Sequence, residues 1–122
     1  MSNLLFRVSI VLGVIGIMGG IIMGIAQDFR LAPAHAHLNL LGFLILFLTG
    51  LFYRVVPKAA ESRMARVQVA VSVIGAVVFP LGILAVTLGR HDTWEPLVIT
   101  GSLIVLAGML MFAAIVFQST RA

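Results

Sequence analysis

The chain has 122 residues, of which 61% are hydrophobic and 10% are charged, and its formal net charge is +4. A soluble domain carries about 25% charged residues, so this composition excludes a soluble globular domain and a disordered chain. The length allows one domain. Its basic residues are scattered around apolar segments and form no stripe, so we expect membrane lipid and no nucleic acid as a partner.

Segments without Lys, Arg, Asp or Glu predict four transmembrane helices. They cover residues 8–26, 31–53, 67–89 and 97–117. Each is long enough to cross a hydrocarbon core of about 30 Å as a helix. The segments are continuously apolar, which argues against the alternating pattern of a membrane β-barrel. We therefore expect an all-α membrane protein with a single four-helix domain over residues 1–122, and we interpret the first segment as a retained helix.

Basic residues are shared unequally between the two ends of these helices. Six belong to the side that holds both chain ends: Arg7, Arg54, Lys58, Arg63, Arg66 and Arg121. Two lie on the other side: Arg30 and Arg90. The cytoplasmic side of a membrane protein carries the excess of Lys and Arg. The sequence therefore predicts a multi-pass protein of a bacterial inner membrane with both termini in the cytoplasm.

Glycines recur on one face of three of the predicted helices. They are Gly16, Gly20 and Gly24 in the first, Gly75 and Gly82 in the third, and Gly101 and Gly108 in the fourth. Small residues at such spacings let helix backbones approach closely inside a bilayer. The seams serve packing within the four-helix unit or between copies of it, and the spacing does not choose between these.

The segment from Pro33 to Phe43, PAHAHLNLLGF, is the most informative part of the chain. Without cysteine, a metal or haem iron has to be held by His, Met, carboxylate or backbone. His35 and His37 lie about one turn inside the second helix, and residues two apart are about 200° apart around a helix. We therefore expect the two imidazoles on opposite faces. Ionisable side chains inside a membrane are costly and usually functional.

Each histidine begins a distinct predicted helix face. One face is a polar stripe with a gap: His35, Asn39, Gly42, Leu46, Thr49 and Tyr53. The other is apolar and bulky: His37, Leu41, Leu44, Leu48 and Phe52. A flat macrocycle fits against either face. We interpret Tyr53, at the end of the helix, as a residue of the interfacial aromatic belt.

The run from His35 to Phe43, continued by GLFYRVVP from Gly50 to Pro57, resembles a segment of the haem–copper oxidase catalytic subunit. The similar branch is that of the C-type oxidases and nitric oxide reductases. In that family, one histidine of the His-x-His motif ligates the low-spin haem and the other ligates the high-spin haem. The family's catalytic subunit has twelve helices in three arcs of four, and its motif helix is the second of the third arc.

The copper centre of that family has no counterpart in this sequence. It needs an adjacent His-His pair and a His four residues before a Tyr. This chain has no His-His pair, and the residue four positions after His91 is Glu95. We therefore do not expect oxygen or nitric oxide reduction by this chain alone, and a partner subunit that completes a catalytic site stays open.

Three copies would supply twelve helices, and a head-to-tail ring brings His35 of one copy opposite His37 of the next. The resemblance thus implies a b-type haem with two histidine ligands, shared between protomers of a homo-oligomer, with a trimer favoured over a dimer. Such a haem suits electron transfer, with quinol or a periplasmic electron carrier as partner. The expected supporting residues are Asn39 to orient a ligand, Gly42 to leave room for the macrocycle, and Arg30 and Arg90 to pair with propionates.

Two other interpretations stay open. If the start of the second helix is extended, His35 and His37 point the same way and bind copper or zinc, with His91 as a third ligand. The other alternative is a cofactor-free accessory subunit packed through its glycine seams. In all three cases His91 belongs to the link 90–96, after which Pro96 opens the last helix.

Overall fold

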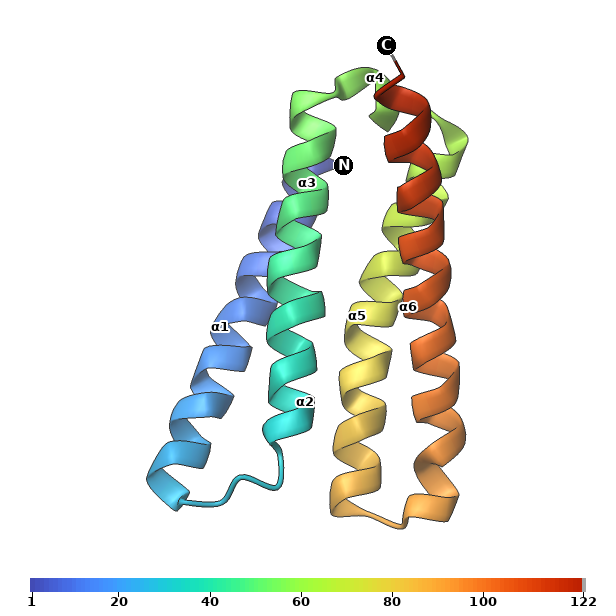
Figure 1. The fold of residues 1–122 in the computed structure, drawn as a ribbon. Coiled ribbons are helices and arrows are strands. Elements are labelled where there is room, and N and C mark those ends of the chain that lie inside the picture. The colour runs from blue at the N-terminus through green and yellow to red at the C-terminus, as the bar shows by residue number, and fades with distance from the viewer. Residues whose placement is uncertain (122) are drawn as a thin grey trace.

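The computed structural model describes residues 1–121, and its regular elements are helices (Figure 1). They are α1 (Ser2–Ala26), α2 (Ala32–His37), the π-helix η1 (Leu38–Ile45), α3 (Leu46–Val55), α4 (Pro57–Ala60), α5 (Arg63–Leu88) and α6 (His91–Ser119). Four stretches are long and apolar enough to cross a membrane: Ser2–Ala26, Ala32–Val55, Arg63–Leu88 and His91–Ser119. The prediction of an all-helical chain with four helices long and apolar enough to cross a membrane is confirmed for the described residues.

The helices alternate in direction, so that the N-terminus and the end of α6 lie at the same end of the molecule (Figure 1). We call this end the terminal half, and the end with the α1–α2 and α5–α6 connections the link half. α1 packs along the second span, which consists of α2, η1 and α3, and α5 packs along α6. The two pairs meet mainly where α2 and η1 lie against α5. The chain is therefore two antiparallel helix pairs packed against each other around a shared core.

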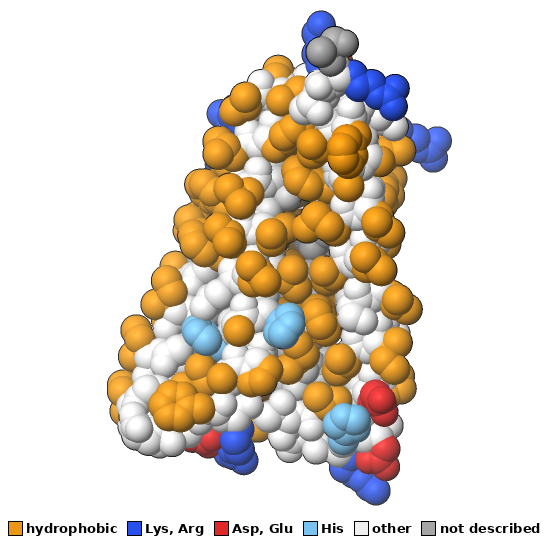
Figure 2. Space-filling model, viewed as in Figure 1, with side chains coloured by type: hydrophobic (Ala, Val, Ile, Leu, Met, Phe, Trp, Pro, Cys, Tyr) orange, Lys and Arg blue, Asp and Glu red, His pale blue; other side chains and the backbone are white. Residues whose placement is uncertain are grey.

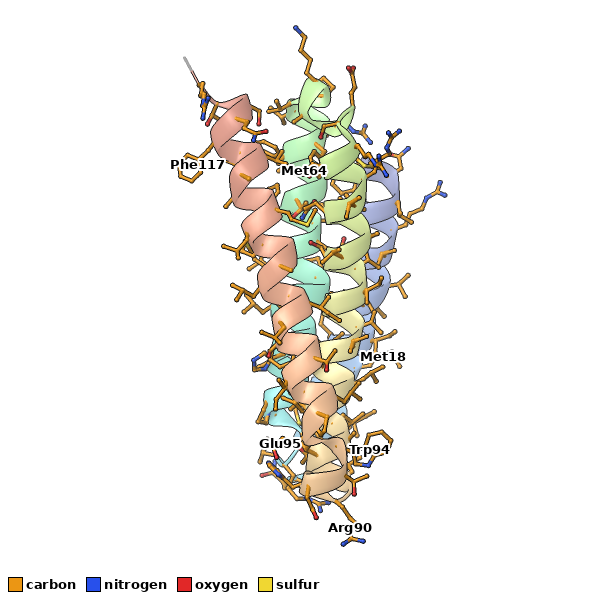
Figure 3. The ribbon with its side chains drawn as sticks, turned by 90° about the vertical axis from the view of Figure 1, so that its right-hand side faces the viewer. Met18, Met64, Arg90, Trp94, Glu95 and Phe117 are labelled. Atoms are coloured by element: carbon orange, nitrogen blue, oxygen red, sulfur yellow. The ribbon has the colours of Figure 1, made fainter. Side chains whose placement is uncertain are left out.

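The last helix is longer than the sequence predicted. α6 begins at His91, so the expected link 90–96 is largely helical, and Pro96 lies inside α6. A segment free of charge marks the part of a helix that suits hydrocarbon, and a helix continues beyond it where polar residues meet water. Asp92 in the first turn favours this start, because the N-terminus of a helix carries positive partial charge. Figure 3 shows Arg90, Trp94 and Glu95 together at the link end.

Glycines set the close contact between α5 and α6. A Cβ added to Gly101 would lie 2.7 Å from the Cα of Phe79, and one added to Gly82 would lie 3.1 Å from the backbone nitrogen of Val98. Both contacts are with backbone, which cannot move aside as a flexible side chain can. The glycine pairs of these helices therefore serve packing within the chain.

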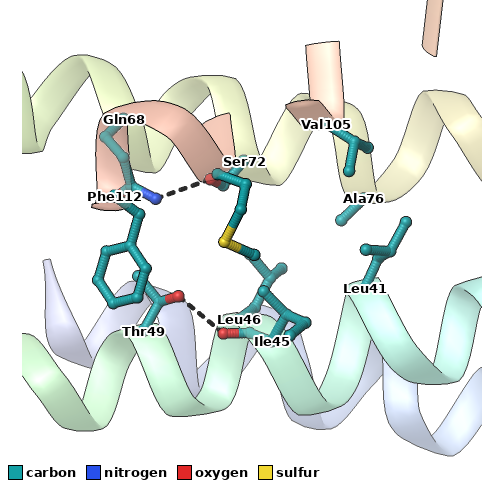
Figure 4. A pocket seen from close by; sticks show the side chains of 10 residues that line it. Leu41, Ile45, Leu46, Thr49, Gln68, Ser72, Ala76, Val105 and Phe112 are labelled. Atoms are coloured by element: carbon teal, nitrogen blue, oxygen red, sulfur yellow. Dashed lines mark hydrogen bonds between the residues drawn. The ribbon is translucent and has the colours of Figure 1, made fainter. Parts of the chain in front are cut away.

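The terminal half holds a buried polar chain. Tyr53 is 1% exposed, and its hydroxyl donates to Oε1 of Gln68 at 2.8 Å. Nε2 of Gln68 in turn donates to the hydroxyl of Ser72 at 2.8 Å (Figure 4). Phe112 of α6 packs edge-on against Phe52, with ring centroids 5.3 Å apart. Tyr53 is thus part of the core, and its interpretation as a belt residue was wrong because the sequence does not show Gln68 beside it.

Charges gather at the two ends of the molecule. Figure 2 shows Lys and Arg at the terminal end, and a mixture of acidic and basic side chains at the link end, with apolar side chains between them. This distribution agrees with a helical bundle whose middle lies in hydrocarbon and whose ends lie in water.

Candidate functional site

The site begins at the start of α2, where proline fixes the helix entry. Pro33 occupies the first turn, where its missing N–H costs nothing and its fixed φ suits a helix. The residues from Ala32 to His37 are α-helical, which places both histidines on a regular helix. Figure 2 shows histidine side chains on the viewed face, among apolar side chains of the link half.

His37 is held by its own helix. Its Nδ1 lies 2.7 Å from the carbonyl oxygen of Pro33, and since a carbonyl only accepts, Nδ1 is the donor. In the neutral ring Nε2 then keeps a free lone pair, which is the tautomer of a metal-binding imidazole. The ring stands edge-on to Phe79 of α5, with centroids 5.0 Å apart. His37 is therefore oriented toward the α5 side of its helix with one nitrogen available.

His35 packs on the opposite side, against α1. A Cβ added to Gly20 would lie only 2.8 Å from Cε1 of His35, so the absence of a side chain at Gly20 makes room for the imidazole. Nδ2 of Asn39 lies 3.4 Å from Nδ1 and 3.3 Å from Nε2 of His35. The amide nitrogen of Asn39 is thus within hydrogen-bonding distance of both ring nitrogens of His35. Asn39 is therefore placed to orient the imidazole of His35.

Asn39 leaves one buried atom without a partner. Its Oδ1 is buried and has no hydrogen-bond donor within the described chain. It points at α1, where a Cβ on Gly16 would come within 1.9 Å of it. A buried carbonyl left unpaired costs about 1–3 kcal/mol. Such a cost in a native structure needs an explanation, and here the amide has its nitrogen on the His35 side and its oxygen on the Gly16 side.

The two imidazoles therefore lie on opposite faces of the second span, as the two-residue spacing predicts. His35 contacts α1, and His37 contacts α5. His91 lies apart from them, exposed at the start of α6, with its Nδ1 3.8 Å from Oε2 of Glu95. Within residues 1–121, no group of three or more His, Cys, Asp or Glu side chains is close enough to hold one metal ion. The copper or zinc alternative needed an extended segment at His35, and the structure has a helix there.

The predicted polar stripe is divided between two neighbours. Tyr53 lies 18 residues after His35, which is five turns of an α-helix, so the sequence put both on one face. In the structure His35 faces α1, whereas Tyr53 bonds to Gln68 of α5. The reason is η1, whose wider turns rotate the rest of the helix about its axis. π-Helical turns are rare and frequently mark functional sites, and neither composition nor periodicity revealed this one.

The gap expected at Gly42 is filled by α1. A Cβ on Gly42 would lie 3.1 Å from both Cβ and Cδ1 of Leu12. Gly42 is buried and serves helix packing, so the room expected there for a macrocycle is absent on that face. The space beside the histidines lies elsewhere. A cavity of about 340 Å³ opens between α1, α2 and α5, and His35 lines it.

The two arginines at the link end differ in their surroundings. Arg30 forms a two-point ion pair with Asp28, with Nε 3.0 Å from Oδ1 and Nη2 2.8 Å from Oδ2. This pair lowers the pKa of the Asp28 carboxyl below its ordinary value, chiefly through the side-chain hydrogen bonds. Arg90 is the exposed residue that precedes α6 (Figure 3). Of the two, Arg90 has the freer guanidinium.

Comparison with known proteins adds no further assignment, because the chain matches no protein-family model, no curated protein and no solved structure. The candidate site thus rests on the geometry of His35, His37 and Asn39.

Proposed function

We propose that the chain is a membrane b-type haem protein in which His35 of one copy and His37 of the next ligate the same iron. The observation that carries the proposal is the placement of two imidazoles on opposite faces of one membrane helix, one of them with Nδ1 already donated to a carbonyl. Because the two histidines lie on opposite faces of their helix, both from one copy cannot ligate the same iron. In a ring of copies, His35 of one copy and His37 of the next can do so. The resemblance to a twelve-helix oxidase subunit favours three copies over two.

The donor set fits a haem iron. Neutral imidazole is a common axial ligand of b-type haem, and Nε2 of His37 is free to serve as one. Gly20 leaves room for the ring of His35. With the Asn39 amide turned over, its unpaired Oδ1 would lie on the His35 side and would accept the N–H of a ligating His35. Asn39 would then be a positioning residue. The Pro33 carbonyl has the same role for His37.

The residues of the site favour electron transfer over reduction of a gas. A bound haem with two histidine ligands supplies one-electron redox chemistry, and its axial ligands tune its potential. The protein would hold the two imidazoles, surround them with apolar side chains and keep water away. Arg90 at the link end would be available to a propionate. The sequence lacks the histidines of a copper centre, which argues against reduction of a gas. Quinol or a periplasmic electron carrier is the proposed partner class.

The distribution of charge supports a location in a bacterial inner membrane with both termini in the cytoplasm. The terminal half carries six of the eight Lys and Arg residues of the chain. Reporter fusions test this orientation. Alkaline phosphatase, which is active outside the cytoplasm, is expected to be inactive at the C-terminus and active when inserted after Arg30. The reverse pattern would contradict the proposed topology.

Absorption spectra of the purified protein, oxidised and then reduced with dithionite, test the haem proposal. We expect a sharp Soret band with separate α and β bands after reduction, and a complex larger than the monomer by native mass spectrometry. His35→Ala and His37→Ala are each expected to abolish the shared haem. His91→Ala is the matched control, because His91 is exposed and far from the pair, and it should keep the full spectrum.

Two outcomes would contradict the proposal. A colourless protein after expression with ample haem would exclude the cofactor and turn attention to metal analysis or to an accessory role. Full haem content in either single variant, His35→Ala or His37→Ala, would exclude the shared site.

A further inference from the structure

The cavity between α1, α2 and α5 is a second feature of the link half. Its volume is about 340 Å³, at the lower end of the range of about 300–1,000 Å³ for small-molecule sites. Its wall includes Gly16 and Gly19 of α1, His35 of α2, and Pro80 and Leu84 of α5. Of the described residues that line it, His35 is the only one with a polar side chain.

The cavity opens toward the lipid. Ile15 and Leu81 line it and are 51% and 52% exposed, and both belong to parts of α1 and α5 that suit hydrocarbon. Gly19 contributes open wall, because a Cβ added there would meet nothing within 4 Å. A molecule dissolved in the bilayer can therefore enter sideways, and an apolar tail can remain in the lipid.

The residues that line the cavity favour one class of lipid-soluble molecule, because the walls are apolar except for the imidazole of His35. An acyl chain would fill the space but would offer the imidazole of His35 no hydrogen bond beyond that to Nδ2 of Asn39, 3.3 Å away, and an underpaired polar group in hydrocarbon is costly. A ligand with a hydroxyl or carbonyl group would pair with a ring nitrogen. The apolar walls suit a ring, and the opening toward Ile15 and Leu81 suits a tail.

We infer that this cavity is a binding site for a membrane-dissolved quinone-type molecule, whose ring carries carbonyl or hydroxyl groups and whose tail stays in the lipid. The polar group of the ring hydrogen-bonds to His35, and the ring lies between α1 and α5. The site adjoins the proposed haem site, because His35 lines the cavity and is also one of the two proposed iron ligands. When His35 binds iron through one ring nitrogen, the N–H of the other can be donated to a quinone carbonyl in place of Asn39.

Photolabelling with a short-chain azidoquinone tests this site in the full-length protein in phosphatidylcholine nanodiscs. We expect label on α1 and α5 residues of the cavity wall by mass spectrometry, and protection by excess decylubiquinone. An alkyl azide with the same chain and no ring serves as the acyl-chain probe. It is expected to label the exposed helix faces without preference and without protection by the quinone.

A matched pair of variants on one helix separates the cavity from the general surface. Gly19→Leu projects into the cavity, and Gly24→Leu does not; an added Cβ meets nothing within 4 Å at either position. We expect Gly19→Leu to lower quinone labelling about tenfold or more and Gly24→Leu to leave it unchanged. His35→Leu keeps the wall apolar, removes the hydrogen bond and should also weaken labelling.

The results separate this inference from the haem proposal. Equal quinone labelling of the two glycine variants, or equal labelling of the cavity wall by the alkyl azide, would overturn the quinone site. Gly19→Leu is expected to keep any haem spectrum of the wild type. Quinone protection in a colourless protein would support the quinone site while the haem proposal fails, and a haem spectrum without protected labelling would do the opposite.

Discussion

The second span holds polar side chains in both halves of the molecule, and the two halves treat them differently. In the terminal half, Tyr53, Gln68 and Ser72 form a closed chain of hydrogen bonds with little space around it. In the link half, Asn39 keeps an unpaired Oδ1, and His35 borders a cavity of about 340 Å³. A buried network in which every polar atom is hydrogen-bonded stabilises a fold. A network with an unpaired polar atom costs stability, and that atom can form a hydrogen bond to a ligand. The comparison therefore separates structural polar residues from candidate functional ones on the same helix.

Gly101→Leu should have the largest effect, because it disrupts the packing of α6 against α5 next to the residue that contacts His37. The new side chain would collide with the backbone of Phe79, whose ring contacts His37. Overpacking costs typically about 1–3 kcal/mol and more against rigid backbone, so we expect a loss of about 3 kcal/mol or more in the free energy of unfolding. Unfolding by SDS titration measures it. Ala107→Leu, at an exposed position of the same helix, is the control and should change little.

Tyr53→Phe should break the closed chain of the terminal half. It leaves Oε1 of Gln68 buried without a donor, which costs about 1–3 kcal/mol in the free energy of unfolding. The double variant Tyr53→Phe with Gln68→Leu removes the stranded acceptor and should recover part of this loss. SDS titration of both variants tests the coupling. A single variant as stable as the wild type would remove the distinction between the two halves.

Asn39→Leu sharpens the comparison. Like Tyr53→Phe it removes a buried polar group, but it should not lower the free energy of unfolding. It removes an amide whose Oδ1 is already unpaired and whose Nδ2 makes only long contacts of 3.3 and 3.4 Å to the His35 ring, so we expect stability equal to the wild type or higher by about 1 kcal/mol. The proposed positioning role predicts a second effect that stability does not report. The reduced spectrum or the midpoint potential of the haem should shift. Loss of stability as large as that of Tyr53→Phe would contradict an open polar site.

The smallest effect is expected at the exposed pair of Asp28 and Arg30. The folded state lowers the pKa of Asp28, so the pair contributes stability above the unfolded value, and this contribution is lost as pH falls through the folded pKa. Thermal unfolding of the wild type and Asp28→Asn should therefore differ slightly at neutral pH and converge in acid. A difference that grows in acid would contradict this sign.

In the terminal half, the sequence did not predict the environment of Tyr53 correctly. The residue types of the second span were all visible, yet Tyr53 was assigned to the interface because its partner Gln68 lies 15 positions away on another helix. In the link half, by contrast, the spacing of His35 and His37 was enough to place them on opposite faces. That prediction depends only on local helix geometry, which is why it holds.

The sequence by itself determined the four membrane-crossing helices, the distribution of charge between the two ends and the opposed histidines. These follow from hydropathy and from the turn of a helix, which are local properties. Only the tertiary structure decided which glycines make room for His35 and Asn39, where η1 rotates the second span, and that Gly42 is closed by Leu12 while a cavity opens beside His35. Those features depend on which side chains of different helices meet, and contacts between distant residues are not encoded in the period of any one segment.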